Sequence, residues 1–477
     1  MPVKNQCKEY QEHSPQWETM RDVACGQDAI HKKSTRYLPK LLEQSQTDYD
    51  HYKMRASFYN ATWRTIAGMV GMLFRKPPIA KLPAALEEYS DDINLRGCDL
   101  DNFAKEVCYE ILTVGRVGLL IDYPPARQGP LTMAQAEQVG LRPFIQTYKT
   151  ESIINWRYAR INNVWKLVMV VLKEQFEIIK DEFTSDYEDR YRVLDLDGGN
   201  YRQRVFRIND RGEDELLETI YPLKNGAPMS EIQFVILDAD GDEDDVDDPP
   251  LIDLANVNLS HYRTVADYEH GCHFTGLPTP YICGYIPTNP DQPDKFAIGS
   301  QTAWALTNPD AKVGYLEFTG QGLQSLKDNI DRKERQMVVL GARMLAEDKA
   351  GVEAFQTLAI RNAGETCILA AIANSISLAL EKALKMMADW AGISGEIEYQ
   401  LNRDYAPVIL DAQGLTALVG AWQSGAISDQ TLFDSLKRGD VIADDVTFED
   451  EQARKDSAPP PRPVTPPAPA QGNAQAA

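Results

Sequence analysis

The chain contains 477 residues, of which 43% are hydrophobic, and its formal net charge is −22 at pH 7. This length exceeds one ordinary hydrophobic core and predicts about two to four globular domains. The negative charge excludes a surface that binds nucleic acid strongly over its whole extent. Any contact with DNA or RNA would have to come from local basic positions or be weak.

Neither the cysteines nor the hydrophobic runs are typical of secreted or membrane proteins. The seven cysteines are an odd number and form no CxxC pair, which predicts reduced thiols in a cytosolic setting. The N-terminus shows no apolar signal-peptide core, and the apolar run at 66–74 is far shorter than the roughly 20 residues of a membrane span. We therefore expect no signal peptide, no transmembrane helix and no membrane partner.

The first half of the chain has the pattern of an α+β region. A helix is predicted at 99–113, followed by a buried strand within 116–125. Residues 141–236 are rich in aromatic and β-branched residues, with a hairpin turn signal at 197–200. An earlier helix is predicted over 48–76, and its apolar face is assigned to the core and not to a base-stacking surface: Tyr52, Tyr59, Trp63, Ile66, Val70 and Leu73.

A second helical region is predicted from about Leu251, after an aspartate-rich run at 238–248 and two prolines, with Asp248 as the N-cap. Short apolar runs among Pro and Gly at 276–318 predict a small β-containing insert. A charged helix is predicted at 320–345, with i,i+4 ion pairs from Asp328 to Arg332 and from Asp331 to Arg335. Its single seam consists of Leu323, Leu326, Ile330, Lys333, Met337, Leu340 and Met344.

The rest of the chain is predicted to be helical up to a Pro/Ala-rich tail. A polar loop at 346–356 precedes a packed helix at 357–391, whose apolar stripe consists of Ile368, Ile372, Ile376, Leu380, Leu384 and Met387. Residues 412–443 predict two or three short helices. The tail lacks the apolar residues of a core and is predicted to be disordered.

No common catalytic motif occurs in the sequence. The chain has no Gly-Lys dipeptide and therefore no Walker A phosphate loop, and it has no G-x-S-x-G or H-E-x-x-H motif. We therefore expect that the protein is not an enzyme, has no cofactor, and depends on a separate ATPase for any work driven by ATP.

Two clusters could bind metal, but their spacing favours structural roles. Asp238, Asp240 and Asp242 match the first positions of a Ca²⁺ loop, whereas Glu243 replaces its glycine and Pro249 its last glutamate. A solvated acidic segment before a helix is the preferred interpretation. The sequence HGCH at 270–273 fits no common zinc pattern, which favours a turn with a partly buried thiol.

Several stretches resemble the portal proteins of tailed bacteriophages, in particular a portal-like family known mainly from sequence. The stretches are YLPKLLEQSQTDYDHYKMRASFYNATWRTIAGMVGMLFRKPP at 37–78, HFTGLPTPYICGY at 273–285 and GYLEFTGQGLQSLKDNIDRKERQMVVLGARML at 314–345. The order of predicted elements is similar as well, and the resemblance extends over nearly the whole chain up to the Pro/Ala tail.

This resemblance implies an α+β portal fold assembled as a ring of about twelve copies around a central DNA channel at one capsid vertex. The implied parts are a wing at 1–248, a first stem helix at 249–271, a clip at 272–318, a second stem helix at 319–345, a tunnel loop at 346–356, a tunnel helix with the rest of the wing at 357–411, a crown at 412–445 and a disordered tail at 446–477.

The resemblance also implies a function in DNA packaging and ejection. The implied partners are double-stranded DNA, the terminase large subunit, the major capsid protein and head-tail adaptor or tail proteins. The location would be the virion, and the host cytoplasm during assembly. Another ring-forming virion adaptor and a metal-dependent nuclease using the aspartate run are the alternatives.

The candidate channel residues lie in the expected tunnel loop and on the helix before it. A net acidic conduit with few bases would let a polyanion slide without tight phosphate contacts. Whether the stem bases face the channel or the subunit seams stays open, because ion pairs with Asp328 and Asp331 would occupy Arg332 and Arg335. The candidates are Lys349, Glu347, Asp348, Gly351, Lys333, Arg335 and Arg343.

Overall fold

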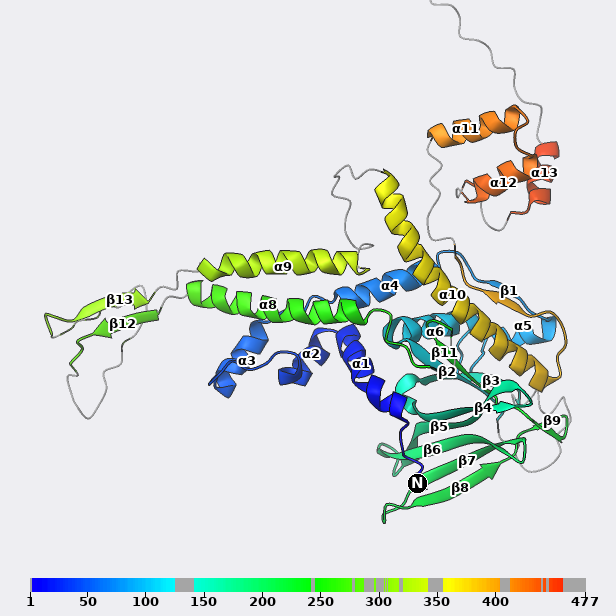
Figure 1. The fold of residues 1–477 in the computed structure, drawn as a ribbon, viewed down its shortest axis with the longest axis horizontal. Coiled ribbons are helices and arrows are strands. Elements are labelled where there is room, and N and C mark those ends of the chain that lie inside the picture. Colours follow the sequence, from blue (N-terminus) through cyan, green and yellow to red (C-terminus); the bar gives the residue numbers. More distant parts are fainter. Residues whose placement is uncertain are drawn as a thin grey trace, which may run out of the picture. The chain divides into compact units, whose positions relative to one another are not determined.

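The computed structural model contains two compact units, Met1–Arg403 and Asp404–Ala477 (Figure 1). Only the backbone is described at 321, 355–367 and 412–413. The structure describes residues 2–124, 141–241, 245–276, 279–286, 296, 304, 306, 308–316, 321–341, 355–403, 412–438, 441–442 and 446–457.

The first unit begins with helices that supply much of its core. One face of α1 is completely buried and consists of Trp17, Met20 and Val23. The predicted helix at 99–113 is confirmed as α6, which starts at an Asp99 cap. The helical segments are α1 (Lys8–Cys25), α2 (Gln27–Lys33), the 3₁₀ turn η1 (Ser34–Arg36), α3 (Gln46–Arg55), α4 (Ala61–Leu73), α5 (Ala84–Ser90) and α6 (Leu100–Val114).

The prediction of a single helix over 48–76 is wrong, because non-helical residues separate α3 from α4. Asn60 starts α4 by accepting a hydrogen bond from the backbone N–H of Trp63, so the break has its own cap. Tyr59 and Trp63 are 48% and 41% exposed, although the predicted apolar face placed them in the core. Trp63 stacks on Tyr109 of α6 with ring centroids 5.3 Å apart.

A three-stranded antiparallel sheet confirms the buried strand expected after α6. β2 (Arg116–Asp122) lies between β11 (Phe234–Asp238) and β3 (Phe144–Lys149). Gly118 permits this packing, because a Cβ at that position would lie 2.3 Å from the Phe234 ring. Two smaller pairs join β1 (Ile79–Lys81) to β14 (Glu398–Gln400) and β9 (Leu223–Lys224) to β10 (Ala227–Pro228).

A five-stranded antiparallel sheet follows, with its strands in sequence order. The predicted hairpin turn is confirmed, since Asp197 pairs with Asn200 and the two glycines between them have φ of 58° and 88°. Ile154, Val171, Tyr191 and Val193 form a core cluster on this sheet. The strands are β4 (Ile153–Ile161, after the turn η2 at Thr150–Ser152), β5 (Val164–Ile179), β6 (Ser185–Asp197), β7 (Asn200–Ile208) and β8 (Asp214–Ile220).

The helix α10 (Phe355–Ala391) packs along the three-stranded sheet, with contacts to β11, β2 and β3. Most of its predicted apolar stripe is buried, including Ile376 and Leu384 at 0% exposure. Ile368 is 65% exposed, so the stripe was predicted one turn too long. Figure 1 shows why: the N-terminal part of α10 extends past the sheet.

The second unit consists of α11 (Ala412–Gln423), α12 (Asp429–Arg438) and α13 (Phe448–Ser457). The short helices expected at 412–443 are confirmed, whereas the expected disorder from residue 446 is wrong over 446–457. Thr447 and Asp450 cap α13 reciprocally, and Phe448 packs against Phe433 with ring centroids 5.5 Å apart. Residues 458–477 lie outside the described part of the chain.

Candidate functional site

Outside the sheets, an antiparallel pair of helices ends in a β-hairpin (Figure 1). We call α8 (Ile252–Gly276) and α9 (Gln321–Val339) the helix pair. At 1.5 Å per residue the two helices are roughly 37 Å and 28 Å long. The hairpin joins β12 (Thr279–Cys283) to β13 (Lys312–Leu316).

Contacts at three levels define the register of the helix pair. Near the hairpin, a Cβ on Gly271 would lie 2.6 Å from Leu323, so the glycine permits close approach of the helices. In the middle, the Lys333 ammonium donates to the backbone oxygen of Ser260 at 2.9 Å. At the other end, Gly341 follows α9 with a φ of 123°, and a Cβ there would lie 3.4 Å from Thr65 of α4 and 3.9 Å from Leu251, just before α8. The pair is therefore continuous along the length of α9.

The helix α9 is shorter than predicted. It ends at Val339, and the positive φ of Gly341 takes the chain out of helical geometry before Leu345. The helix begins at Gln321, close to the predicted start. The predicted seam is confirmed from Leu323 to Met337, where its members are partly or fully buried in the pairing with α8. It is wrong at Leu340, which follows the end of α9 and is 38% exposed.

The helix α8 is anchored to the N-terminal helices by polar and aromatic contacts. Asn258 is fully buried, accepts hydrogen bonds from the backbone and side chain of Thr62, and donates to the Tyr59 carbonyl at 2.7 Å. The Tyr52 hydroxyl donates to Asp267 at 2.6 Å. These contacts hold α8 rigidly against α3 and α4, so α9 has a fixed surface to pack on.

Lys333 belongs to the interface inside the helix pair. Its ammonium also donates to the Thr264 hydroxyl of α8, so the side chain points toward α8 of the same chain. Burial lowers the pKa of Lys333, and the nearby positive charges of Arg263 and Arg332 add to that effect. This geometry argues against a role for Lys333 as a phosphate contact in a channel.

A second titratable contact crosses the helix pair. His261 of α8 is 4% exposed, and its Nε2 lies 3.5 Å from the Glu334 carboxylate of α9. Burial lowers the pKa of His261, while the Glu334 charge opposes that shift and Lys333 adds to it. The neutral imidazole is therefore the form that suits this packing.

Arg332 and Arg335 lie on the exposed side of α9, where neither predicted ion pair forms. Arg332 donates to the Asn329 side chain at 2.9 Å, and Arg335 donates to the backbone oxygen of Asp331 at 3.2 Å. Both arginines border a shallow apolar groove on the helix pair, together with Val257, Gln336, Val339 and Leu340. Among the described residues, no carboxylate forms an ion pair with either guanidinium group.

The hairpin carries exposed apolar residues. Tyr315 is 60% exposed, and Val313 and Tyr281 are about half exposed. Gly314 faces Tyr281 across the two strands, and a Cβ there would meet its ring at 2.9 Å. The predicted β-containing insert therefore has a paired, partly apolar structure at the far end of the helix pair.

Five predicted channel residues lie outside the described part of the chain: Arg343, Glu347, Asp348, Lys349 and Gly351. Their proposed location between α9 and α10 stays a prediction. Of the seven candidates, the structure describes Lys333 and Arg335, which lie on different sides of α9.

The first aspartate of the acidic run is structural. Asp238 ends β11 and is 1% exposed, with Arg116 at 3.3 Å, so it does not belong to a solvated loop. Arg116 also donates to the Asp245 carbonyl and lies 4.3 Å from the Trp156 ring centroid. Asp248 lies four residues before α8 begins and contacts His13 at 3.5 Å, so it is not the N-cap.

The HGCH stretch lies in the last part of α8. His270 packs edge-on against Tyr52 and Phe274. Among the residues that the structure describes, no group of three or more His, Cys, Asp or Glu side chains could hold a metal ion. No helix in this part of the chain combines the length and apolar character that crossing a membrane requires.

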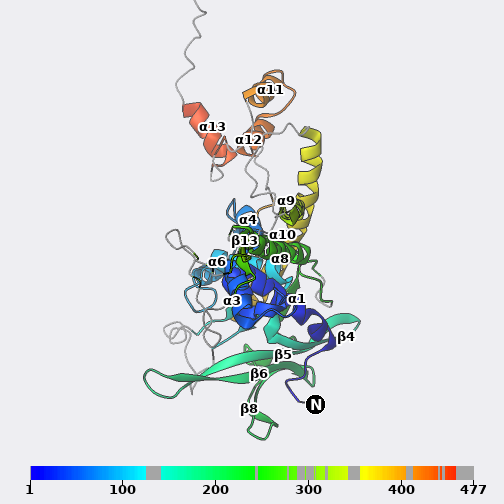
Figure 2. The ribbon, with the colours of Figure 1, turned by 90° about the vertical axis from the view of Figure 1, so that its left-hand side faces the viewer.

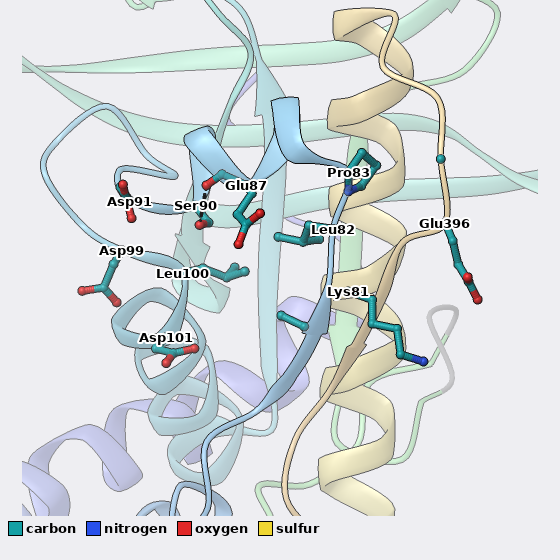
Figure 3. A pocket seen from close by; sticks show the side chains of 12 residues that line it. Lys81, Leu82, Pro83, Glu87, Ser90, Asp91, Asp99, Leu100, Asp101 and Glu396 are labelled. Carbon is teal, nitrogen blue, oxygen red and sulfur yellow. Dashed lines mark hydrogen bonds between the residues drawn. The ribbon is translucent and has the colours of Figure 1, made fainter. Parts of the chain in front are cut away.

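A pocket near β1 and α6 includes several carboxylates in its lining (Figure 3). Asp99 serves as the α6 cap and accepts from the Asn102 backbone at 2.8 Å, which lowers its pKa. Burial, with the Asp99 charge adding to it, raises the pKa of Asp101. The capping contact gives Asp99 a structural role at the start of α6.

The sequence analysis did not identify the residues that hold the helix pair in place. Asn258, His261 and Asp267 each lie on the α8 face toward the body of the unit or toward α9. Asn258 follows Ala255 by three residues and precedes Tyr262 by four, so helical spacing places it on the same face as these residues. A polar residue at such a position was the available signal.

Comparisons with known proteins give one family match and several structural ones. The family model of a domain of unknown function, DUF4055, matches residues 250–391, from α8 through α10. No curated protein matches the chain.

The similar solved structures come from gene transfer agent particles. One is a chain of the virion of the native particle, with a TM-score of 0.40 and 11% identity over 85% of this chain and 96% of that one. Another, from the neck of the empty particle, has a TM-score of 0.41 and 12% identity over 79% and 90%. A third, from the neck of the native particle, has a TM-score of 0.36 and 10% identity over 80% and 91%.

Proposed function

We propose that the protein is a portal protein, which forms a ring around a DNA channel at one vertex of a phage capsid. The helix pair with its terminal hairpin carries this proposal. The two helices and the hairpin occur in the order that the portal resemblance implies for two stem helices and a clip between them. The long helix α10 then follows the second stem helix, as expected for a tunnel helix.

The charge of α9 suits a wall past which DNA slides. Its strongly exposed charged residues are Lys327, Asp328, Asp331, Arg332, Glu334 and Arg335, three basic and three acidic. An exposed surface of balanced charge makes few lasting phosphate contacts, and those it makes weaken as salt rises. The functional requirement of a conduit is weak contact, which this composition meets.

In this proposal the protein has no catalytic step of its own. A terminase large subunit would supply ATP hydrolysis, and the hairpin at the far end of the helix pair would offer it an exposed apolar surface around Tyr315. Capsid and tail or adaptor proteins would be the other partners, with the virion as the location.

Electron microscopy and mass measurement of the purified full chain test the proposal. We expect a ring with a central hole and a stalk, and a mass corresponding to many copies. A ring without a stalk would favour the alternative that the protein is another ring-forming virion adaptor. A protein that stays monomeric at micromolar concentration in both low and moderate salt would contradict the proposal.

A further inference from the structure

The longest strand of the five-stranded sheet carries a two-stranded hairpin at each of its ends. β5 pairs with β4 alone over 164–168 and with β6 alone over 173–179. β7 joins β6 only as far as Arg190. We call residues 157–166 the basic tip and residues 175–187 the acidic tip.

The two tips have opposite charge. The acidic tip contains one lysine and four carboxylates, at Glu177, Asp181, Glu182 and Asp186. The basic tip contains no acidic residue and has three bases, Arg157, Arg160 and Lys166. Within the described residues these three bases form no ion pair, whereas the lysine of the acidic tip is paired with Asp186. Each tip therefore presents uncompensated charge.

Both tips also expose large apolar side chains. In the acidic tip Phe183 is 87% exposed and Ile179 is 75% exposed. In the basic tip Val164 and Trp165 are each 53% exposed. Two-stranded hairpins are marginally stable in water when nothing covers them, and exposed apolar groups beside charge are typical of protein interfaces. These features indicate that each tip is covered by a partner.

The tips cannot cover each other within one copy. They lie at opposite ends of β5, which at about 3.3 Å per residue separates them by about 50 Å. Figure 2, in which the helix pair is seen nearly end on, shows the hairpin of β5 and β6 extending to one side of the sheet and β4 lying on the other. The tips therefore point in opposite directions across the axis of the helix pair.

We propose that the acidic tip of one copy docks on the basic tip of the next copy. Two different surfaces that meet head to tail generate a ring when the rotation between copies closes. Opposite charge fixes the direction of this contact, and the exposed apolar residues supply burial at its centre. This interface rests on the proposed ring and identifies the surfaces that would join its members.

Charge reversal at the two tips tests the contact. The acidic-tip variant carries Glu177→Lys and Glu182→Lys, and the basic-tip variant carries Arg157→Glu and Arg160→Glu. Asp210→Lys with Glu218→Lys, on exposed positions of the same sheet, is the matched control. Mass photometry measures the assembled fraction against protein concentration, and thermal unfolding confirms that each variant is folded.

Each tip variant alone should need a roughly ten-fold or higher concentration for half assembly, because like charges then meet at every interface. A 1:1 mixture of the two variants should recover assembly, since alternating copies again bring opposite charges together. The control should assemble like the parent chain.

The outcomes separate this inference from the proposed function. A parent chain that forms no ring contradicts the proposed function itself. A parent ring that persists in both tip variants, or variants that lose the ring and do not recover it on mixing, overturns only the tip-to-tip contact. Loss of assembly with the acidic-tip variant alone would place the acidic tip against another basic surface of the neighbouring copy and would also overturn the tip-to-tip contact.

Discussion

At the scale of single residues, Gly118 shows how tightly the three-stranded sheet is packed. A Cβ at this position would lie 2.3 Å from Phe234 and 2.9 Å from Ile153, and both side chains are buried. We expect Gly118→Ala to lower the free energy of unfolding by about 1–3 kcal/mol, as overpacked cores do.

Chemical denaturation measures this effect. The control is Gly71→Ala in α4, where a Cβ meets nothing within 4 Å and alanine favours the helix. Equal stability of the two variants would show that the region around Gly118 yields to the added methyl group.

His261 predicts a pH dependence of the helix pair. Because burial lowers its pKa from the ordinary 6.5, the folded state binds the proton less well than the unfolded chain. The stability that His261 contributes is therefore present above about pH 6.5 and is lost as the pH falls below that value. Glu334 and Lys333 on α9 are the charged groups that face it.

Thermal unfolding between about pH 5 and 7.5 tests this dependence. His261→Phe should flatten the part of the profile below about pH 6.5, whereas His51→Phe at an exposed position should retain the parent profile. Parallel profiles for His261→Phe and the parent would contradict the assignment.

Residue patterns predicted the α9 seam correctly from Leu323 to Met337 but not at the exposed Leu340, and they did not predict the partners of its one lysine. The 3,4 repeat placed Lys333 on the seam. The oxygens of Ser260 and Thr264 that accept hydrogen bonds from its ammonium lie on α8, about 70 positions earlier in the chain. Such long-range partners are set by tertiary packing, which periodicity does not contain.

At the scale of elements, the attachment of α8 depends on Asn258. Its side chain satisfies two groups of Thr62 and the Tyr59 carbonyl in a fully buried position. We expect Asn258→Ala to cost about 1–3 kcal/mol, because buried polar groups lose their partners. Asn256→Ala, on the exposed side of the same helix, should have little effect. Hydrogen exchange of the α8 and α9 amides, faster in the first variant alone, is the measurement.

The α13 helix predicts where the C-terminus can be cut. Truncation after Ser457 should leave the second unit as stable as in the full chain, because α13 and its Phe448 contact remain. Truncation after Ile442 should destabilise the unit, since Phe433 then loses the aromatic ring that packs on it. Limited proteolysis of both truncated chains is the measurement. Equal resistance of the second unit in the two chains would contradict this prediction.

The errors in element boundaries have specific physical causes. Tyr59 and Trp63 continued the helical spacing, but a capped break at Asn60 interrupts the helix without any Pro or Gly. The stretch 448–457 is strongly polar and lies next to the Pro/Ala tail, so its composition predicted disorder. It is nevertheless helical, and the Phe448 ring packs against Phe433. Local composition is weak evidence where a few tertiary contacts, here Phe448 with Phe433 and Lys455 with Trp422, hold a helix in place.

At the scale of the whole molecule, the order of the elements was predictable and the interfaces were not. Helix, strand and hairpin signals gave the sequence of parts from α6 to α10, because those parts are long and strongly patterned. The opposite charges at the ends of β5 became visible only when the register of β4, β5 and β6 showed which residues extend beyond the sheet. The predicted channel residues between α9 and α10 stay predictions.

Cryo-electron microscopy of the purified full chain tests the portal proposal most directly. We expect a rotationally symmetric ring with the helix pairs side by side around a central hole. The α9 face that carries Arg332 and Arg335 should point toward the hole or toward the seams beside it. A closed particle without a hole, or a ring in which the helix pairs lie on the outer rim, would contradict it.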